Sequence, residues 1–153
     1  MPFTLEIITP GRVVLHDDQT DFIQVRGKEG ELGVLPGHTP LFTALADDLM
    51  IVRSHGDRED IVTVMGGFMD VRPDRVTILS PAAELAAEID EVRARQAAER
   101  AQLEIDRQRT AEAEGALERA LVRLRAVESV GREAIRPSRV HGAEQIPPDI
   151  RGK

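Results

Sequence analysis

The sequence has no cysteine, no tryptophan and no tyrosine. Without cysteine, the chain cannot form a disulfide framework, use a thiol nucleophile or bind a metal through thiolates. Aromatic residues make up only 3% of the chain, which argues against a surface on which nucleic-acid bases could stack. The net charge of −7 argues the same way, because a phosphate backbone is also negative. We therefore expect no nucleic-acid partner.

Long hydrophobic runs are missing as well. No run reaches the length of a transmembrane helix, and no signal peptide opens the chain. We therefore expect a soluble cytosolic protein with no direct membrane insertion, so that any link to a membrane comes through a partner. The length of 153 residues predicts one compact domain, or one small domain with an appendage.

The part of the chain before Pro81 has the pattern of a small all-β domain. Residues 3–8 alternate as a half-buried strand does. Further strands are predicted at Val13–Leu15, Phe22–Arg26, Leu49–Arg53, Ile61–Met65, Phe68–Val71 and Val76–Leu79. Turn residues, such as Gly66-Gly67, separate these runs. Many short strands at regular spacing predict a β-sandwich or barrel, which we assign to residues 1–82.

Residues 83–133 have a helical pattern instead. Ala, Glu, Arg, Leu and Gln dominate, and Gly115 is predicted to divide two helices near residues 87–111 and 116–130. The predicted apolar stripes are Leu85, Ile89, Val92, Ala94, Ala98, Ala101 and Ile105 in the first helix, and Leu117, Ala120, Leu121, Leu124 and Val127 in the second. The expected fold is α+β: an N-terminal all-β sandwich followed by a C-terminal antiparallel two-helix hairpin. Residues 134–153 are rich in Pro and Gly and predict a flexible tail.

The run KEGELGVLPGHTPL, residues 28–41, concentrates glycine and proline. It matches neither the phosphate-loop pattern nor G-x-G-x-x-G. Gly30 and Gly33 are expected to form tight turns with positive φ, and Pro36-Gly37 another. Leu32, Val34 and Leu35 are expected to fill the core between these turns. We favour a structural loop over a catalytic one.

Candidate catalytic and metal-binding residues do not form a recognisable site. The four histidines His16, His38, His55 and His141 are scattered, and none pairs with another at metal-binding spacing. No serine lies in a nucleophile elbow. We therefore predict no catalytic site and no metal site.

Arginines in the helical half form a candidate anion site. In IDEVRA, residues 89–94, Asp90, Arg93 and Ala94 share a helical face with Arg100. Arg119 and Arg123 share a face of the second helix. Guanidinium groups that converge in a folded hairpin suit phosphate. The alternative is a solvated face with ordinary ion pairs, such as Glu91 with Arg95, and spacing alone favours it.

Three segments resemble the epsilon subunit of F-type ATP synthases of the bacterial type. They are GELGVLPGHTPL at 30–41, VMGGFMDVRPDRVTIL at 64–79 and ERALVRLRAVE at 118–128. The resemblance covers residues 3 to about 131. It implies a non-catalytic subunit of the central stalk, which couples proton flow through the c-ring to ATP synthesis.

The resemblance also implies partners and site residues for the β domain. It would dock on the gamma subunit and the c-ring at the cytoplasmic face of the bacterial plasma membrane, as a peripheral part of the synthase. The implied docking residues are Gly30, Glu31, Leu32, Gly33, Pro36, Gly37, His38 and Pro40.

The hairpin has two implied roles. When it extends into the catalytic head of alpha and beta subunits, it would inhibit ATP hydrolysis, with Arg119, Arg123 and Arg125 facing an acidic loop on a beta subunit. When it is folded, it would bind ATP as a regulatory ligand rather than a required cofactor. The implied ATP residues are Glu84, Ile89, Asp90, Arg93, Ala94, Arg100, Arg119 and Arg123. The competing hypothesis is a free-standing ATP-sensing conformational switch with the same fold.

Overall fold

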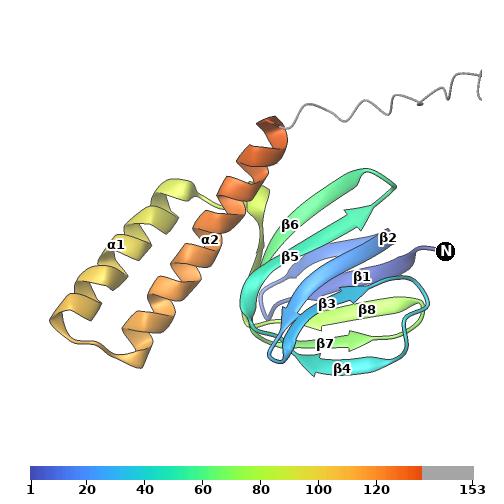
Figure 1. The fold of residues 1–153 in the computed structure, drawn as a ribbon, viewed down its shortest axis with the longest axis horizontal. Helices are drawn as coiled ribbons and strands as arrows, with labels where there is room; N and C mark the ends of the chain where they lie inside the picture. Colours follow the sequence, from blue (N-terminus) through green and yellow to red (C-terminus); the bar gives the residue numbers. More distant parts are fainter. Residues whose placement is uncertain (136–153) are drawn as a thin grey trace, which may run out of the picture.

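The computed structural model describes residues 1–135, and the side chains of residues 1–130. In this part of the chain, nine strands precede two long helices (Figure 1). The strands are β1 (Phe3–Ile8), β2 (Val13–Gly27), β3 (Gly30–Val34), β4 (Leu41–Ala44), β5 (Asp47–Ser54), β6 (Arg58–Met65), β7 (Phe68–Val71), β8 (Arg75–Leu79) and β9 (Ala83–Leu85). The predicted α+β class is confirmed. Most of the predicted tail, residues 136–153, lies outside the described residues.

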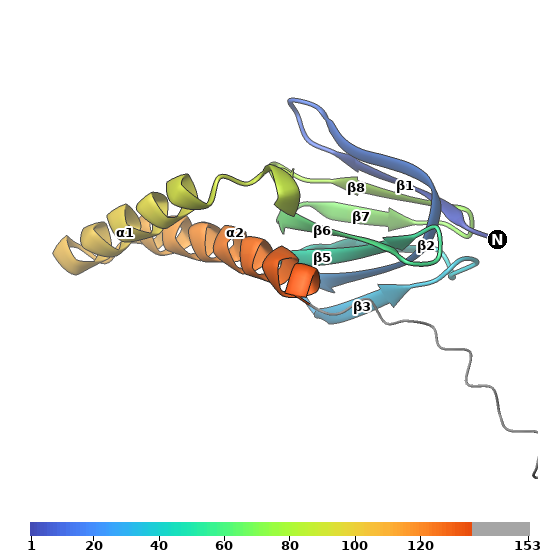
Figure 2. The same ribbon diagram turned by 90° about the horizontal axis from the view of Figure 1, so that it is seen from above.

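The strands form two layers that share β2, seen from the side in Figure 2. One layer has the order β4-β7-β8-β1-β2, and the other contains β2-β5-β6-β9 with β3 on the free side of β2. β2 pairs with β1 up to Thr20, and with β5 and β3 beyond it. The pairings shift register near Thr20, where β2 passes from one layer into the other. The predicted sandwich is therefore closed by one continuous strand.

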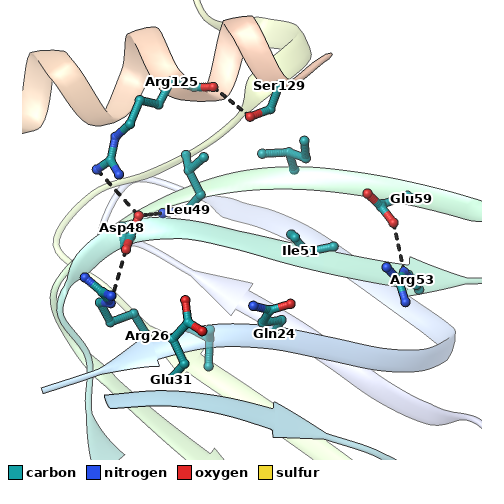
Figure 3. A pocket seen from close by; sticks show the side chains of 12 residues that line it. Gln24, Arg26, Glu31, Asp48, Leu49, Ile51, Arg53, Glu59, Arg125 and Ser129 are labelled. Carbon is teal, nitrogen blue, oxygen red and sulfur yellow. Dashed lines mark hydrogen bonds and ion pairs between the residues drawn. The ribbon is translucent and has the colours of Figure 1, made fainter. Parts of the chain in front are cut away.

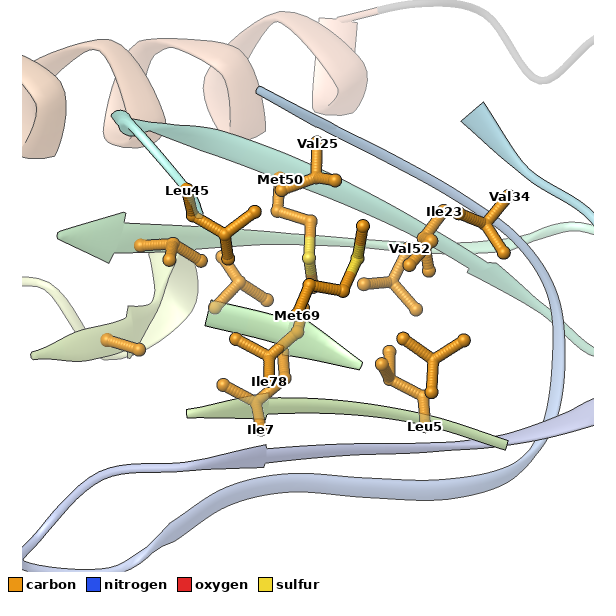
Figure 4. Packing of buried hydrophobic residues seen from close by; sticks show 14 of the residues in the cluster. Leu5, Ile7, Ile23, Val25, Val34, Leu45, Met50, Val52, Met69 and Ile78 are labelled. Carbon is orange, nitrogen blue, oxygen red and sulfur yellow. The ribbon is translucent and has the colours of Figure 1, made fainter. Parts of the chain in front are cut away.

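Alternating side chains of both layers meet in one hydrophobic core (Figure 4). Leu5 and Ile7 of β1 are fully buried, and so are Met50 and Val52 of β5. This is the period of two that strands impose on a half-buried sheet. β6 is an exception, since Ile61 to Met65 are all buried. Its inner face packs into the core, while its outer face is covered by the helical part.

The strand predictions are largely confirmed, with two differences. The separate runs Val13–Leu15 and Phe22–Arg26 belong to one strand, β2, because the polar residues between them also pair with β1. β3, β4 and β9 were not predicted. β9 lies just past residue 82, where the sequence predicts the end of the β domain, and it pairs with β6.

The predicted loop at Gly30 is wrong for its first half. Gly33 does not form a positive-φ turn but lies within β3, opposite Gln24. A Cβ at Gly33 would lie 3.1 Å from the Phe22 ring, so the missing side chain makes room for that ring. Gly30 and Gly37 do have positive φ, +137° and +78°. Leu35 is 60% exposed and does not fill the core as predicted.

The helices are α1 (Glu91–Arg107) and α2 (Ala111–Ile135), preceded by the short 3₁₀ turn η1 (Ala86–Glu88). The predicted break at Gly115 is wrong, because Gly115 lies inside α2. The connection is residues 108–110 instead. Thr110 caps α2, since its hydroxyl oxygen accepts a hydrogen bond from the Ala113 amide at 3.1 Å.

The two helices approach each other through small residues. α1 packs along α2 and is buried there at Ala94 and Ala101, while α2 buries Ala113 and Ala120. The predicted stripes are wrong at two of their members. Val92 is 62% exposed and Leu121 is 45% exposed. α2 also packs on the sandwich, against β5 and β6, and on η1.

Candidate functional site

A pocket of about 400 Å³ lies where the sandwich leads into the hairpin. It is lined by Glu84, Glu88, Ile89, Asp90, Arg93, Ala94, Gln96, Ala97, Arg100 and Arg123. Seven of the eight residues predicted for ATP binding are thus brought together. Arg119 is the exception and does not line this pocket. Its guanidinium lies over Gly115, one helical turn earlier, where a Cβ would come within 3.1 Å of it.

Asp90 has a structural role in this pocket. It is the N-cap of α1, and its Oδ1 accepts a hydrogen bond from the Arg93 amide at 3.2 Å. A carboxylate at this position is also stabilised by the positive end of the helix dipole. Helix capping therefore explains Asp90 of the IDEVRA motif, a role that spacing alone did not reveal.

Among the described charged groups around the pocket, two guanidinium groups are not paired with an acid and could bind an anion. Arg123 Nε lies 2.8 Å from Glu84 Oε2, and Glu88 Oε2 lies 2.7 Å from Arg12 Nη2. Within residues 1–130, the guanidinium groups of Arg93 and Arg100 form no ion pair or hydrogen bond. They lie seven residues apart on α1, so both project from the same side of the helix. This arrangement can bind a multivalent anion such as a polyphosphate.

Arg12 is a member of this surface that sequence reasoning missed. It lies in the turn between β1 and β2, 76 residues from Glu88. No local pattern in the sequence connects two positions so far apart. Its pairing with Glu88 neutralises one of the acids that line the pocket.

The three arginines predicted to face a beta subunit have different environments. Arg123 is paired with Glu84, as described above. Arg125 Nη2 lies 3.5 Å from Asp48 Oδ1 on β5, beside a second pocket of about 590 Å³ (Figure 3). Arg119 has no ion pair among the described side chains. The folded hairpin therefore holds two of the three against the sandwich.

The predicted docking residues lie on β3 and the turn that follows it. Gly30, Glu31, Leu32 and Gly33 form the strand paired to β2, and Pro36-Gly37 forms the turn. The Gly37 amide donates to the Pro73 carbonyl at 2.9 Å, which ties this turn to the β7–β8 turn. Further on, His38 Nδ1 lies 2.6 Å from the carbonyl of Thr39. Of this set, Gly30, Glu31, Gly33, Gly37 and Pro40 are exposed, and Glu31 adds a charged side chain to the segment.

An apolar row on the outer face of the other layer was not predicted. It consists of Val13, Phe42, Phe68 and Leu79, each at least 49% exposed, with Ile8 between them. Phe68 pairs with Leu79, and Leu79 with Ile8, so the row runs across neighbouring strands. The Phe42 and Phe68 rings stack at 5.5 Å. A continuous exposed row of this kind is typical of a protein-binding surface.

Two further findings concern the described residues only. No group of three or more His, Asp or Glu side chains in this part of the chain is arranged to hold a metal ion. Among the described helices, none is both long enough and apolar enough to cross a membrane.

Comparison with known proteins gives the family. Residues 2–86 match the family of the ATP synthase delta/epsilon chain, beta-sandwich domain. The ATP synthase epsilon chain of Syntrophobacter fumaroxidans is 44% identical over 128 residues, which cover 81% of this chain and 94% of that one. The chain belongs to the ATP synthase epsilon family. The epsilon chain of Pediococcus pentosaceus is 40% identical over 122 residues, covering 80% of this chain and 87% of that one.

Solved structures agree with this assignment. A chain in the mitochondrial ATP synthase of Euglena gracilis, in an assembly of OSCP, F1 and c-ring, matches with a TM-score of 0.70 and 27% identity. The match covers 84% of this chain and 81% of that one. A chain from the Tetrahymena thermophila enzyme has the same fold, at a TM-score of 0.53 and 14% identity. The predicted resemblance is confirmed: this is an F-type epsilon subunit of the bacterial type, a central-stalk component of an enzyme complex.

Proposed function

We propose that this epsilon subunit docks on the gamma subunit and the c-ring and so couples proton flow to ATP synthesis. Family membership is the observation that carries this proposal, because the match spans both the sandwich and the hairpin. The solved relative from Euglena gracilis belongs to an assembly that includes the c-ring. In its own bacterial synthase, the subunit would lie at the cytoplasmic face of the plasma membrane, peripheral to the bilayer.

Two surfaces of the sandwich suit two different partners. The apolar row of Val13, Phe42, Phe68 and Leu79 fits an apolar face of gamma, because burying exposed aromatic and aliphatic area drives association. The segment around Glu31 and His38 would face the polar end of the c-ring. The two surfaces lie on different parts of the sandwich, so both partners can bind together.

The hairpin is proposed to act as a brake on ATP hydrolysis. Extended into the head, it would bring Arg119, Arg123 and Arg125 to an acidic loop on a beta subunit. Opposite charges there would set the orientation of the hairpin and the rate at which it binds, more than its affinity for the beta subunit. The small apolar contact between α2 and the sandwich supports this, since its buried members among the described side chains are Ile61, Ala86 and Ala126, with Leu49 and Ile89 partly buried against them.

ATP is proposed as the ligand that favours the folded hairpin. Arg93 and Arg100 on α1 and Arg123 on α2 surround one pocket, which exists only while the helices are folded together. ATP would shift the equilibrium by its differential affinity for this state. Calorimetry with the isolated chain tests this directly. Absence of binding at millimolar ATP would remove the proposal.

The deciding experiment compares two forms of the subunit. A synthase head stripped of epsilon is assayed for ATP hydrolysis after addition of the full chain or of residues 1–86, which contain the matched family domain, residues 2–86. We expect both to bind and only the full chain to inhibit. If both bind and neither inhibits, the subunit couples without a brake. If neither binds gamma, the alternative of a free-standing ATP-sensing switch gains support over the rotor function.

A further inference from the structure

The sandwich supplies one carboxylate for each of two arginines on α2. Glu84 on β9 lies 2.8 Å from Arg123, and Asp48 on β5 lies 3.5 Å from Arg125. These are two of the three arginines assigned above to an acidic loop on a beta subunit. In the folded hairpin, Glu84 and Asp48 of the sandwich therefore pair with the arginines that would otherwise face the acidic loop of a beta subunit.

The Asp48 carboxylate is positioned before the hairpin arrives. Its Oδ1 accepts a hydrogen bond from the Leu49 amide at 2.7 Å, which fixes the side chain against its own strand. Its Oδ2 lies 3.4 Å from Arg26 Nε on β2, and the side chain is only 18% exposed (Figure 3). A carboxylate held in this way loses little rotamer freedom when Arg125 binds, so the pair is better prepared than an ordinary surface ion pair.

Arg26 also lowers the cost of releasing the hairpin. A partly buried carboxylate that loses its only cation is left uncompensated, which is unfavourable. Asp48 retains Arg26 as a counter-charge when Arg125 leaves, because both residues belong to the sandwich. The contact can therefore open and close without leaving an unpaired charge on β5.

The apolar contact beneath these pairs is small. Its buried residues among those described are Ile61, Ala86 and Ala126, and the partly buried Leu49 and Ile89 pack against them. Burial of so few carbon atoms stabilises the docked hairpin only modestly. The two ion pairs therefore add to a docking contact whose apolar part is small compared with the sandwich core.

We propose that Asp48 and Glu84 form an acidic dock, which imitates the acidic partner and holds Arg123 and Arg125 on the sandwich. An arginine in the dock cannot at the same time face a beta subunit, so docking and inhibition exclude each other. This inference rests on the proposed brake for its biological role. The dock itself is a property of the isolated chain and can be tested there.

The test is hydrogen exchange of the α2 amides in the full chain. Asp48→Asn removes the charge but keeps an oxygen that can accept from the Leu49 amide. We expect it to raise exchange in the second half of α2 about twofold to fivefold, the ratio that corresponds to a modest ion pair. Arg125→Gln should have the same effect. The double variant should exchange no faster than either single variant, because both remove one interaction.

Two controls make the result specific. Asp70→Asn removes a more exposed ion pair, with Arg72 at 3.3 Å, from β7, which lies away from the strands that α2 packs on, and it should leave α2 exchange unchanged. Amides of β1 and β8 should keep their protection in all variants, which excludes general unfolding. Unchanged α2 exchange in Asp48→Asn, or single effects that multiply in the double variant, would overturn the dock.

The outcome is independent of the proposed brake. Exchange in the isolated chain involves no synthase head, so a missing brake does not affect it. If Asp48→Asn loosens α2 while the full chain fails to inhibit hydrolysis, the dock stands and the brake fails. If the brake is present and the dock is real, Asp48→Asn should inhibit hydrolysis more strongly than the unmodified chain.

Discussion

Gly67 lies directly against the backbone of Leu79. A Cβ at Gly67 would come within 2.0 Å of the Leu79 carbonyl oxygen, and the residue has a φ of +100°. The close approach lets the turn between β6 and β7 fold back on the end of β8. No side chain larger than hydrogen fits there without moving backbone.

Gly67→Ala should therefore destabilise the sandwich by about 3 kcal/mol or more, from backbone strain and steric overlap together. Urea unfolding of the full chain measures this. Gly56→Ala is the matched control, because Gly56 has a similar φ of +77° but no atom within 4 Å of its Cβ position. It should cost only about 1 kcal/mol, from strain alone. Equal losses in the two variants would contradict the close-approach argument.

The small residues between the helices predict a second effect. Ala101→Leu should destabilise the hairpin by about 1–3 kcal/mol, because the added carbons have no space between α1 and α2. Thermal melting followed by helical circular dichroism would show it. Ala111→Leu, at an exposed position at the start of α2, should change the melting little. A more stable Ala101→Leu hairpin would mean that the helices are loosely packed.

The proposed nucleotide pocket predicts a loss of ATP affinity on removal of an unpaired cation. Arg100→Gln should weaken ATP binding about tenfold, since a hydrogen bond to a charged group contributes about 1.5–3 kcal/mol. Calorimetry on the isolated chain measures the dissociation constants. Arg95→Gln is the control on the same helix, because Arg95 is paired with Glu91 at 2.7 Å and does not line the pocket. Similar losses for both variants would indicate non-specific charge attraction.

The apolar row predicts a loss of gamma binding without a loss of folding. Phe68→Ser should weaken the complex with gamma about tenfold or more, as expected for an aromatic residue near the centre of an interface. The fold should survive, because Phe68 is already 49% exposed. Val92→Ser removes an exposed apolar side chain from α1 and should leave affinity for gamma unchanged. Unchanged binding in Phe68→Ser would place the interface elsewhere.

Sequence patterns predicted the fold class because the relevant signals are local. Alternation in residues 3–8 and the breaker pair Gly66-Gly67 depend only on neighbouring residues. Gly115 misled the helix prediction, since its intrinsic cost in a helix is about 1 kcal/mol and packing of α2 on two sides outweighs it. Thr110, as the cap of α2, was the signal that could have corrected this.

The predicted pocket was partly visible in the sequence for the same reason. Arg93 and Arg100 lie on one helix, so their common face follows from helical period alone. Glu88 and its partner Arg12 could not be found in this way, because tertiary folding alone brings them together. The apolar row also depends on which strands are neighbours, and strand order is not written in any local pattern.

The continuity of β2 has a mechanical consequence. Its 15 residues belong to both layers, so a load applied to one layer passes into the other through covalent bonds rather than through side-chain packing. The sandwich should therefore turn as one stiff body under torque. Flexibility would be concentrated in the short stretch around residues 86–90, where the chain leaves the sheet and enters α1. We expect the helices to swing about that stretch while the sandwich stays bound to its partners.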